Sequence, residues 1–205
     1  MLREAILSLL LQTVADWECL IYNDGGPDVG DIVAEFQDER LVYLQGERNL
    51  GFPLGYNAIM DSGRVRGKYI SYVDDDDIAQ PRKLAVMGGY LDRFPQVGLV
   101  YSDIAQTRNG HVVNYWSADS APGRCHFSPD KLMAGSFIQP LRVMHRHYDY
   151  VRWSDVPVIA GDWLYMKALF NAGVQFSYLP QILGVYRWHS TPGVQNNSGI
   201  RNVTY

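Results

Sequence analysis

Helix-like and strand-like segments alternate through the first hundred residues of this 205-residue chain, and this alternation is what most constrains its fold. Apolar residues at helical spacing predict helices at residues 2–12, 31–37, 53–62 and 81–94. Short apolar runs between them predict strands at residues 17–22, 41–44, 68–73 and 97–101. Because strands separated by helices form βαβ units, we expect an α/β protein with a mostly parallel sheet.

The pattern changes after about residue 103. Residues 104–128 mix polar residues with short alternations, which predicts a hairpin or an irregular excursion. Helical spacing returns at residues 162–172, and Gly173 follows it as a typical helix C-terminus. The chain has no low-complexity linker and no repeat, so we expect one domain over residues 1–205 with two halves, about 1–103 and about 104–205.

Composition excludes several classes of protein. The formal net charge of −4 argues against a nucleic-acid partner, because a phosphate-binding surface needs clustered Lys and Arg. No stretch approaches the roughly 18 apolar residues of a membrane-spanning helix. Cys19 and Cys125 are the only two thiols, so no disulfide framework is expected and a reducing, cytoplasmic compartment fits best.

Four consecutive aspartates, residues 74–77, follow the third predicted strand. On an extended strand, Asp74 and Asp76 would face one way and Asp75 and Asp77 the other. Two carboxylates a few ångströms apart repel by on the order of 1–4 kcal/mol, which a divalent cation such as Mn²⁺ or Mg²⁺ would offset. Ligands of open α/β sheets bind beyond the carboxyl ends of the strands, where this run falls. The run predicts a metal or nucleotide site, with a solvated acidic loop as the alternative.

The first hundred positions resemble the family 2 glycosyltransferases of GT-A fold, which transfer sugars from nucleotide-sugar donors. The resemblance rests on LREAILSLLLQTVADWECLIYNDGG, NLGFPLGYNAIM, GKYISYVDDDDIAQPRKL and LDRFPQVGLVYSD, in this order. It extends more loosely through SFIQPLRVMHR, AGDWLYMKALFNAG and LPQILGVYRWHS to about residue 190. It implies a Rossmann-like, mixed and mostly parallel sheet flanked by helices. Family members usually begin with a strand before the first helix, so it also implies that the first strand is missing here.

The resemblance implies donor-binding roles in the first half, the nucleotide-sugar-binding half. Asp24 corresponds to the acidic residue that contacts the nucleotide base, although a turn-forming role is the alternative. Asn49, Gly51 and Asn57 lie beside the donor. Asp74, near the ribose, and Asp75 complete the expected nucleotide-sugar-binding residues.

The resemblance also implies a metal site and a catalytic base. Asp76 matches the metal-binding aspartate of the DxD motif, and His189 matches a histidine that completes the metal site, although many histidines are satisfied surface residues. In the acceptor-side half, Asp162 matches the general base, and helix capping is its alternative role. Trp153 and Trp163 suggest a sugar-stacking surface, or else buried core.

These observations predict a metal-dependent, inverting glycosyltransferase of the hexosyltransferase type. It would move a sugar from a nucleotide-diphospho-sugar to a hydroxyl of a saccharide or lipid-linked acceptor, in polysaccharide or surface-glycan synthesis. A lipid-linked acceptor would bring it to the inner face of the membrane as a peripheral protein, and an exposed sheet edge would favour a homo-oligomer. The alternatives are a catalytically degenerate GT-A-fold binding protein and a metal-dependent phosphohydrolase or nucleotidyltransferase.

Overall fold

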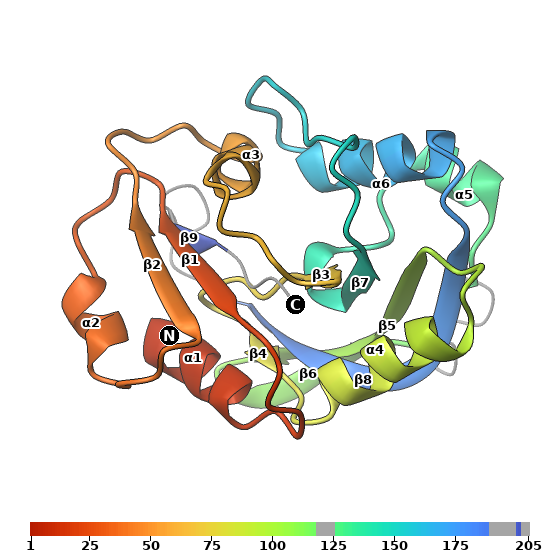
Figure 1. Cartoon of the computed structure of the whole chain (residues 1–205). Coiled ribbons are helices and arrows are strands. Elements are labelled where there is room, and N and C mark those ends of the chain that lie inside the picture. Colours follow the sequence, from red (N-terminus) through yellow and green to blue (C-terminus); the bar gives the residue numbers. More distant parts are fainter. Residues whose placement is uncertain (118–125, 189–199, 202–205) are drawn as a thin grey trace.

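The computed structural model describes residues 1–117, 126–188 and 200–201, and Figure 1 shows their arrangement. The helices are α1 (Leu2–Leu10), α2 (Gly30–Ala34), α3 (Leu54–Asp61), α4 (Lys83–Arg93), α5 (Pro129–Ala134) and α6 (Gly161–Asn171), with a 3-10 turn at Pro140–Arg142. The strands are β1 (Cys19–Asn23), β2 (Leu41–Gln45), β3 (Tyr69–Ser71), β4 (Ile78–Ala79), β5 (Leu99–Arg108), β6 (His111–Trp116), β7 (Val143–Arg146), β8 (Phe176–Trp188) and β9 (Ile200–Arg201). The predicted alternation of helices and strands in the first half is confirmed.

The described strands form two sheets. The smaller has the order β2-β1-β9, and the larger has the order β3-β7-β5-β8-β4 with β6 paired to β5. Parallel pairing occurs between β1 and β2 and between β5 and β8, and the other described pairs are antiparallel. The mixed sheet of an α/β protein is therefore confirmed. It contains more antiparallel pairs than the alternation predicted, because β7 from the second half lies between β3 and β5.

The break between the two sheets falls between β1 and β3. The segments that lead into these two strands are joined by side-chain hydrogen bonds. The Glu18 carboxylate, just before β1, accepts from the main-chain N–H (2.7 Å) and from Nε (2.8 Å) of Arg66, just before β3. No ladder joins β1 to β3 in the part of the chain that the structure describes, and at its far end β1 pairs instead with β9. Within the described residues, the smaller sheet is thus connected to the larger one by side-chain and helix contacts rather than by strand pairing.

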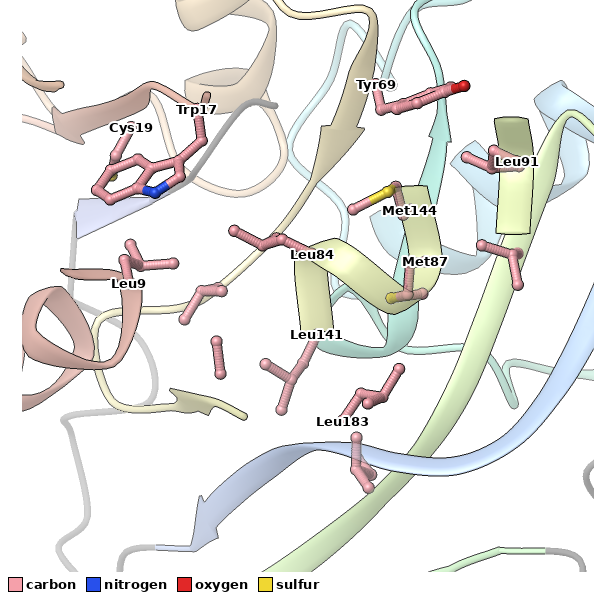
Figure 2. Packing of buried hydrophobic residues seen from close by; sticks show 14 of the residues in the cluster. Leu9, Trp17, Cys19, Tyr69, Leu84, Met87, Leu91, Leu141, Met144 and Leu183 are labelled. Atoms are coloured by element: carbon pink, nitrogen blue, oxygen red, sulfur yellow. The ribbon is translucent and has the colours of Figure 1, made fainter. Parts of the chain in front are cut away.

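Helices cover both faces of the larger sheet. Successive residues of β5 point to opposite faces, so Val100 packs with Met87 of α4 and Met144 of β7, as part of the cluster shown in Figure 2. Leu99, its neighbour, packs on the other face with Leu169 of α6. This helix–sheet–helix layering places the N-terminus of α6 on the opposite face from α4.

The structure also bears on the cysteines and on membrane-spanning helices. Cys19 is buried as a free thiol, and Cys125 lies outside the described residues. Among the described residues, none of the helices has the length and apolar character needed to cross a bilayer.

Candidate active site

The four aspartates form a turn, not the end of a strand. Strand β3 ends at Ser71, and the N–H of Asp77 donates to the carbonyl of Asp74 (3.0 Å). The predicted alternation of side chains along this run is therefore wrong, because the backbone reverses within it. The turn gathers Asp74, Asp76 and Asp77, which can each offer a carboxylate oxygen within 4.8 Å of the others. We call these three residues the Asp triad.

Asp77 is the residue of the triad that the sequence analysis did not assign. Its side chain is buried, and this burial, followed by the nearby charges of Asp74 and Asp76, raises its pKa well above the ordinary value. The aspartate run itself contained a signal for the turn, because Asp favours turns by bonding to nearby backbone groups. Asp75 is half-buried and lies outside the triad.

A buried lysine lies close to the triad. Lys83, at the start of α4, is fully buried, and its Nζ donates to the carbonyls of Leu141 (2.7 Å) and Tyr72 (3.1 Å). Burial lowers the pKa of Lys83 to about 7, while the negative charges of Asp77 and Asp74 act in the opposite direction. Lys83 thus connects the segment between β3 and the aspartates to the 3-10 turn before β7.

The donor set of the triad fits a divalent cation. Mg²⁺ and Mn²⁺ prefer hard oxygen ligands, and three carboxylates at this spacing repel one another unless a cation or a proton intervenes. The pKa of Asp77 is raised mainly by burial, and the negative charges of Asp74 and Asp76 add to this effect. His189, the other expected metal ligand, lies outside the described residues.

Asp24 fastens a loop of the first half to the end of β1. Its buried carboxylate accepts hydrogen bonds from the main-chain N–H groups of Leu50 (2.7 Å) and Gly51 (2.8 Å). Gly25 allows the close approach, because it has a φ of +73° and an added Cβ would lie 2.3 Å from the Arg48 backbone. Its predicted contact with a nucleotide base stays a prediction.

The other expected donor-side residues differ in their surroundings. Gly51 has a φ of +78°, and Asn49 is exposed on the same loop. Asn57 is buried, where its Oδ1 accepts from the Trp153 N–H (3.1 Å) and its Nδ2 donates to the Trp153 carbonyl (3.2 Å). The amide of Asn57 thus braces α3 against the segment that precedes α6, and its role toward a donor stays a prediction.

Asp162 lies in the first turn of α6. Its Oδ1 accepts a hydrogen bond from the Trp163 N–H (2.7 Å), and its Oδ2 accepts one from Ser136 Oγ (3.3 Å). Burial raises the pKa of this carboxyl above its ordinary value. A carboxylate that binds a proton more readily than usual is suited to act as a general base.

Stacked aromatic rings connect the helices that carry these groups. Trp153 is 3% exposed and stacks between Tyr56 of α3 and Tyr165 of α6, each with its ring centroid 4.2 Å away. The hydroxyl of Tyr56 donates to Oδ1 of Asp74 (3.3 Å), so the stack also reaches the triad. Trp153 is buried in the core and forms no sugar-stacking surface, while the indole N–H of Trp163 donates to the Leu132 carbonyl (2.5 Å).

The described residues thus combine an α/β fold, three clustered carboxylates beyond a strand and a separate carboxylate on a later helix, as expected for the class of transferases that the sequence resembles. Comparison with known proteins identifies the family. The profile described as glycosyl transferase family 2 matches residues 1–168. The chain therefore belongs to glycosyltransferase family 2.

Individual relatives and solved structures give the same result. An uncharacterized glycosyltransferase of Haemophilus influenzae is 31% identical over 211 residues, covering 95% of this chain and 64% of the relative. Another from Methanocaldococcus jannaschii is 33% identical over 105 residues, covering 49% of this chain and 36% of the relative. The chain thus spans less than two thirds of the length of either one. The crystal structure of TarS from S. aureus matches with a TM-score of 0.71 at 19% identity, over 91% of this chain and 34% of that one, which shows the GT-A fold.

Proposed function

We propose that this chain forms the nucleotide-sugar- and acceptor-binding part of a metal-dependent, inverting glycosyltransferase. The observation that carries the proposal is the Asp triad, where three carboxylate oxygens lie within 4.8 Å of one another just beyond β3. Such an arrangement is costly unless a cation offsets its charge. Membership of glycosyltransferase family 2 supplies the reaction class that uses such a site.

Asp74, Asp76 and Asp77 would hold Mn²⁺ or Mg²⁺, and the bound ion would stabilise the negative charge that develops on the leaving nucleoside diphosphate. On the donor side, the loop fastened by Asp24 would present Asn49 and the main chain of Gly51 to the nucleotide. Asp75 would contribute a further polar contact there.

Asp162 would act on the acceptor. In this reaction its carboxylate takes the proton from the acceptor hydroxyl while the hydroxyl oxygen bonds to the anomeric carbon. The bond from that carbon to the diphosphate oxygen breaks, and the electron pair leaves with the diphosphate. Attack opposite to the leaving group inverts the anomeric centre. The half-buried setting of Asp162 and its raised pKa support the role of base.

The relatives support a setting in glycan synthesis. They include the glycosyltransferase GlyA of Streptococcus pneumoniae, 28% identical over 62% of this chain and 16% of that protein. We propose a saccharide or lipid-linked acceptor, a cytoplasmic location with peripheral association at the inner face of the membrane, and assembly as a homo-oligomer.

A second candidate function is a catalytically degenerate GT-A-fold binding protein. One observation favours it: β1 and β3 are not paired in the described residues, so the donor side lacks a continuous sheet. A degenerate domain would show no metal-dependent stabilisation by any nucleotide. A phosphohydrolase or nucleotidyltransferase receives no comparable support, because the family profile is that of glycosyl transferases.

Thermal unfolding with UDP, GDP, CDP and dTDP, each with and without Mn²⁺, tests the proposal. A nucleotide at about 100 times its dissociation constant should stabilise the fold by roughly 2.7 kcal/mol. Asp76→Asn should remove the metal-dependent part of this shift, whereas the control Asp31→Asn, at an exposed site on α2, should retain it. Absence of a shift in the wild type with every nucleotide would favour the degenerate domain. Net hydrolysis that acceptors never outcompete would instead indicate a hydrolase.

A further inference from the structure

The Asp triad is held in place by a residue more than a hundred positions further along the chain. The main-chain N–H of Arg187, on β8, donates to Asp77 Oδ1 (3.1 Å), and its side-chain Nε donates to the main-chain carbonyl of Asp76. One residue therefore contacts two of the three members of the triad, one through its carboxylate and one through its backbone. Nothing in the local sequence of the aspartate run indicates this partner.

The guanidinium of Arg187 is itself fixed by α1. Its NH1 donates to Glu4 Oε2 (2.5 Å) and its NH2 to the carbonyl of Met1 (3.3 Å). The Arg187 side chain is 18% exposed, and its proximity holds the pKa of Glu4 below the ordinary value. These contacts engage all three nitrogen atoms of the planar guanidinium, so its position is set by α1 and by the turn together.

The positive charge of Arg187 is paired with Glu4, which lies outside the Asp triad. The hydrogen bonds of the guanidinium go to Glu4 and to main-chain carbonyls, and its positive charge is matched by Glu4 at salt-bridge distance. Its hydrogen bond to the turn ends on the Asp76 carbonyl, not on a carboxylate. Arg187 therefore orients the turn through a hydrogen bond to its backbone, while its charge also acts on Asp77, whose pKa it lowers against the larger effect of burial. This is how residues behind metal ligands usually act: they orient the ligands and tune affinity.

We propose that Arg187, supported by Glu4, is a positioning residue for the metal site formed by the Asp triad. The inference rests on the proposed metal-dependent function and adds to it the residues that shape the site. It predicts that metal affinity depends on a hydrogen bond from β8 to the backbone of Asp76, and indirectly on the first turn of α1. Removal of such supporting contacts typically weakens metal binding about 10–100-fold.

The test measures Mn²⁺ affinity directly, by the EPR signal of free Mn²⁺ during titration, alongside the melting temperature of the metal-free protein. Arg187→Met should raise the dissociation constant for Mn²⁺ about 10–100-fold and change the line shape of bound Mn²⁺. Arg187→Lys should be intermediate, because an ammonium keeps the charge but cannot present the same fork. Glu4→Gln should weaken binding less than Arg187→Met, since the bond to Asp76 is retained.

Arg3→Met is the matched control, because Arg3 also forms an Arg–Glu pair from α1, and the hydrogen bonds of its side chain both go to Glu35 and not to the triad. It should bind Mn²⁺ like the wild type. Arg187→Met that binds Mn²⁺ within twofold of the wild type overturns the inference and leaves the proposed function intact. If that variant does not fold, Arg187→Lys and Glu4→Gln decide, and wild-type affinity in both overturns the inference. A wild type that binds nucleotide but no Mn²⁺ overturns the metal part of the proposed function, and this inference with it.

Discussion

The carboxylate of Asp24 should determine how firmly the donor-side loop is held. It accepts two main-chain N–H groups, from Leu50 (2.7 Å) and Gly51 (2.8 Å), and is 6% exposed. Asp24→Asn retains one oxygen but places an NH₂ donor against the other N–H, so one hydrogen bond to a charged group is lost. Such a bond contributes about 1.5–3 kcal/mol. For a chain of this length the melting temperature should fall by roughly 3–12 °C.

Urea unfolding and thermal unfolding would measure the loss, and hydrogen–deuterium exchange would locate it. The amides of Leu50 and Gly51 should exchange faster in Asp24→Asn than in the wild type, because their acceptor has been weakened. Asp28→Asn is the matched control, since Asp28 precedes α2 on the same side of the protein but is exposed. It should leave the exchange at Leu50 and Gly51 unchanged. An Asp24→Asn variant with wild-type stability and wild-type exchange would refute the view that this carboxylate fastens the loop.

Three further changes address the base and its support. Asp162→Asn should abolish transfer but retain nucleotide binding. Burial raises the pKa of Asp162, so ionisation of this carboxyl destabilises the wild-type fold as pH rises through that pKa. The Asp162→Asn variant should therefore have a higher melting temperature than the wild type at pH 7–8 and lose this advantage in acid. Melting curves across pH test this, and equal melting temperatures at pH 8 would contradict it. Gly161→Ala should cost about 1–3 kcal/mol in urea unfolding, because its Cβ would lie 2.8 Å from the Phe52 ring and from Pro53 Cγ, and an unchanged midpoint would count against this packing. Trp153→Ala should cost about 3–5 kcal/mol by the same measurement, since it empties the space between two rings, and a loss below 1 kcal/mol would show that the stack is not tight.

Local patterns in the sequence predicted the local elements well. The helices α1, α4 and α6 begin and end within a few residues of the predicted spans, because an amphipathic helix is encoded by the spacing of its own apolar residues. Strand β8 was not predicted. It contains Pro180, its burial does not alternate, and its pairing with β5 shifts register after Ser102. It is stabilised by pairing with β5, whose residues lie about 80 positions earlier in the chain, so no local pattern indicates it.

In the candidate site, too, the residues that follow from local sequence were predicted, and the contacts between distant segments were not. Asp74 and Asp76 follow from the position of the aspartate run after a strand, and they do lie together. The predicted orientation of Asp77 was wrong because β3 ends at Ser71 and the aspartate run forms a turn instead of continuing the strand. Arg187 and the bracing role of Asn57 could not be derived, because both depend on contacts between segments that are distant in sequence. Such contacts depend on the tertiary fold and produce no hydrophobic periodicity in the sequence.

The stacked rings of Tyr56, Trp153 and Tyr165 make the separation of α3 and α6 a fixed length. Rings in van der Waals contact leave no compressible layer between them, so the two helices cannot approach further when a substrate binds. The helix that carries Asp162 and the helix whose Tyr56 donates to Asp74 are therefore connected through one continuous row of packed rings. A substitution that enlarges or removes a ring in this row would change the distance between Asp162 and the Asp triad, although it touches neither of them.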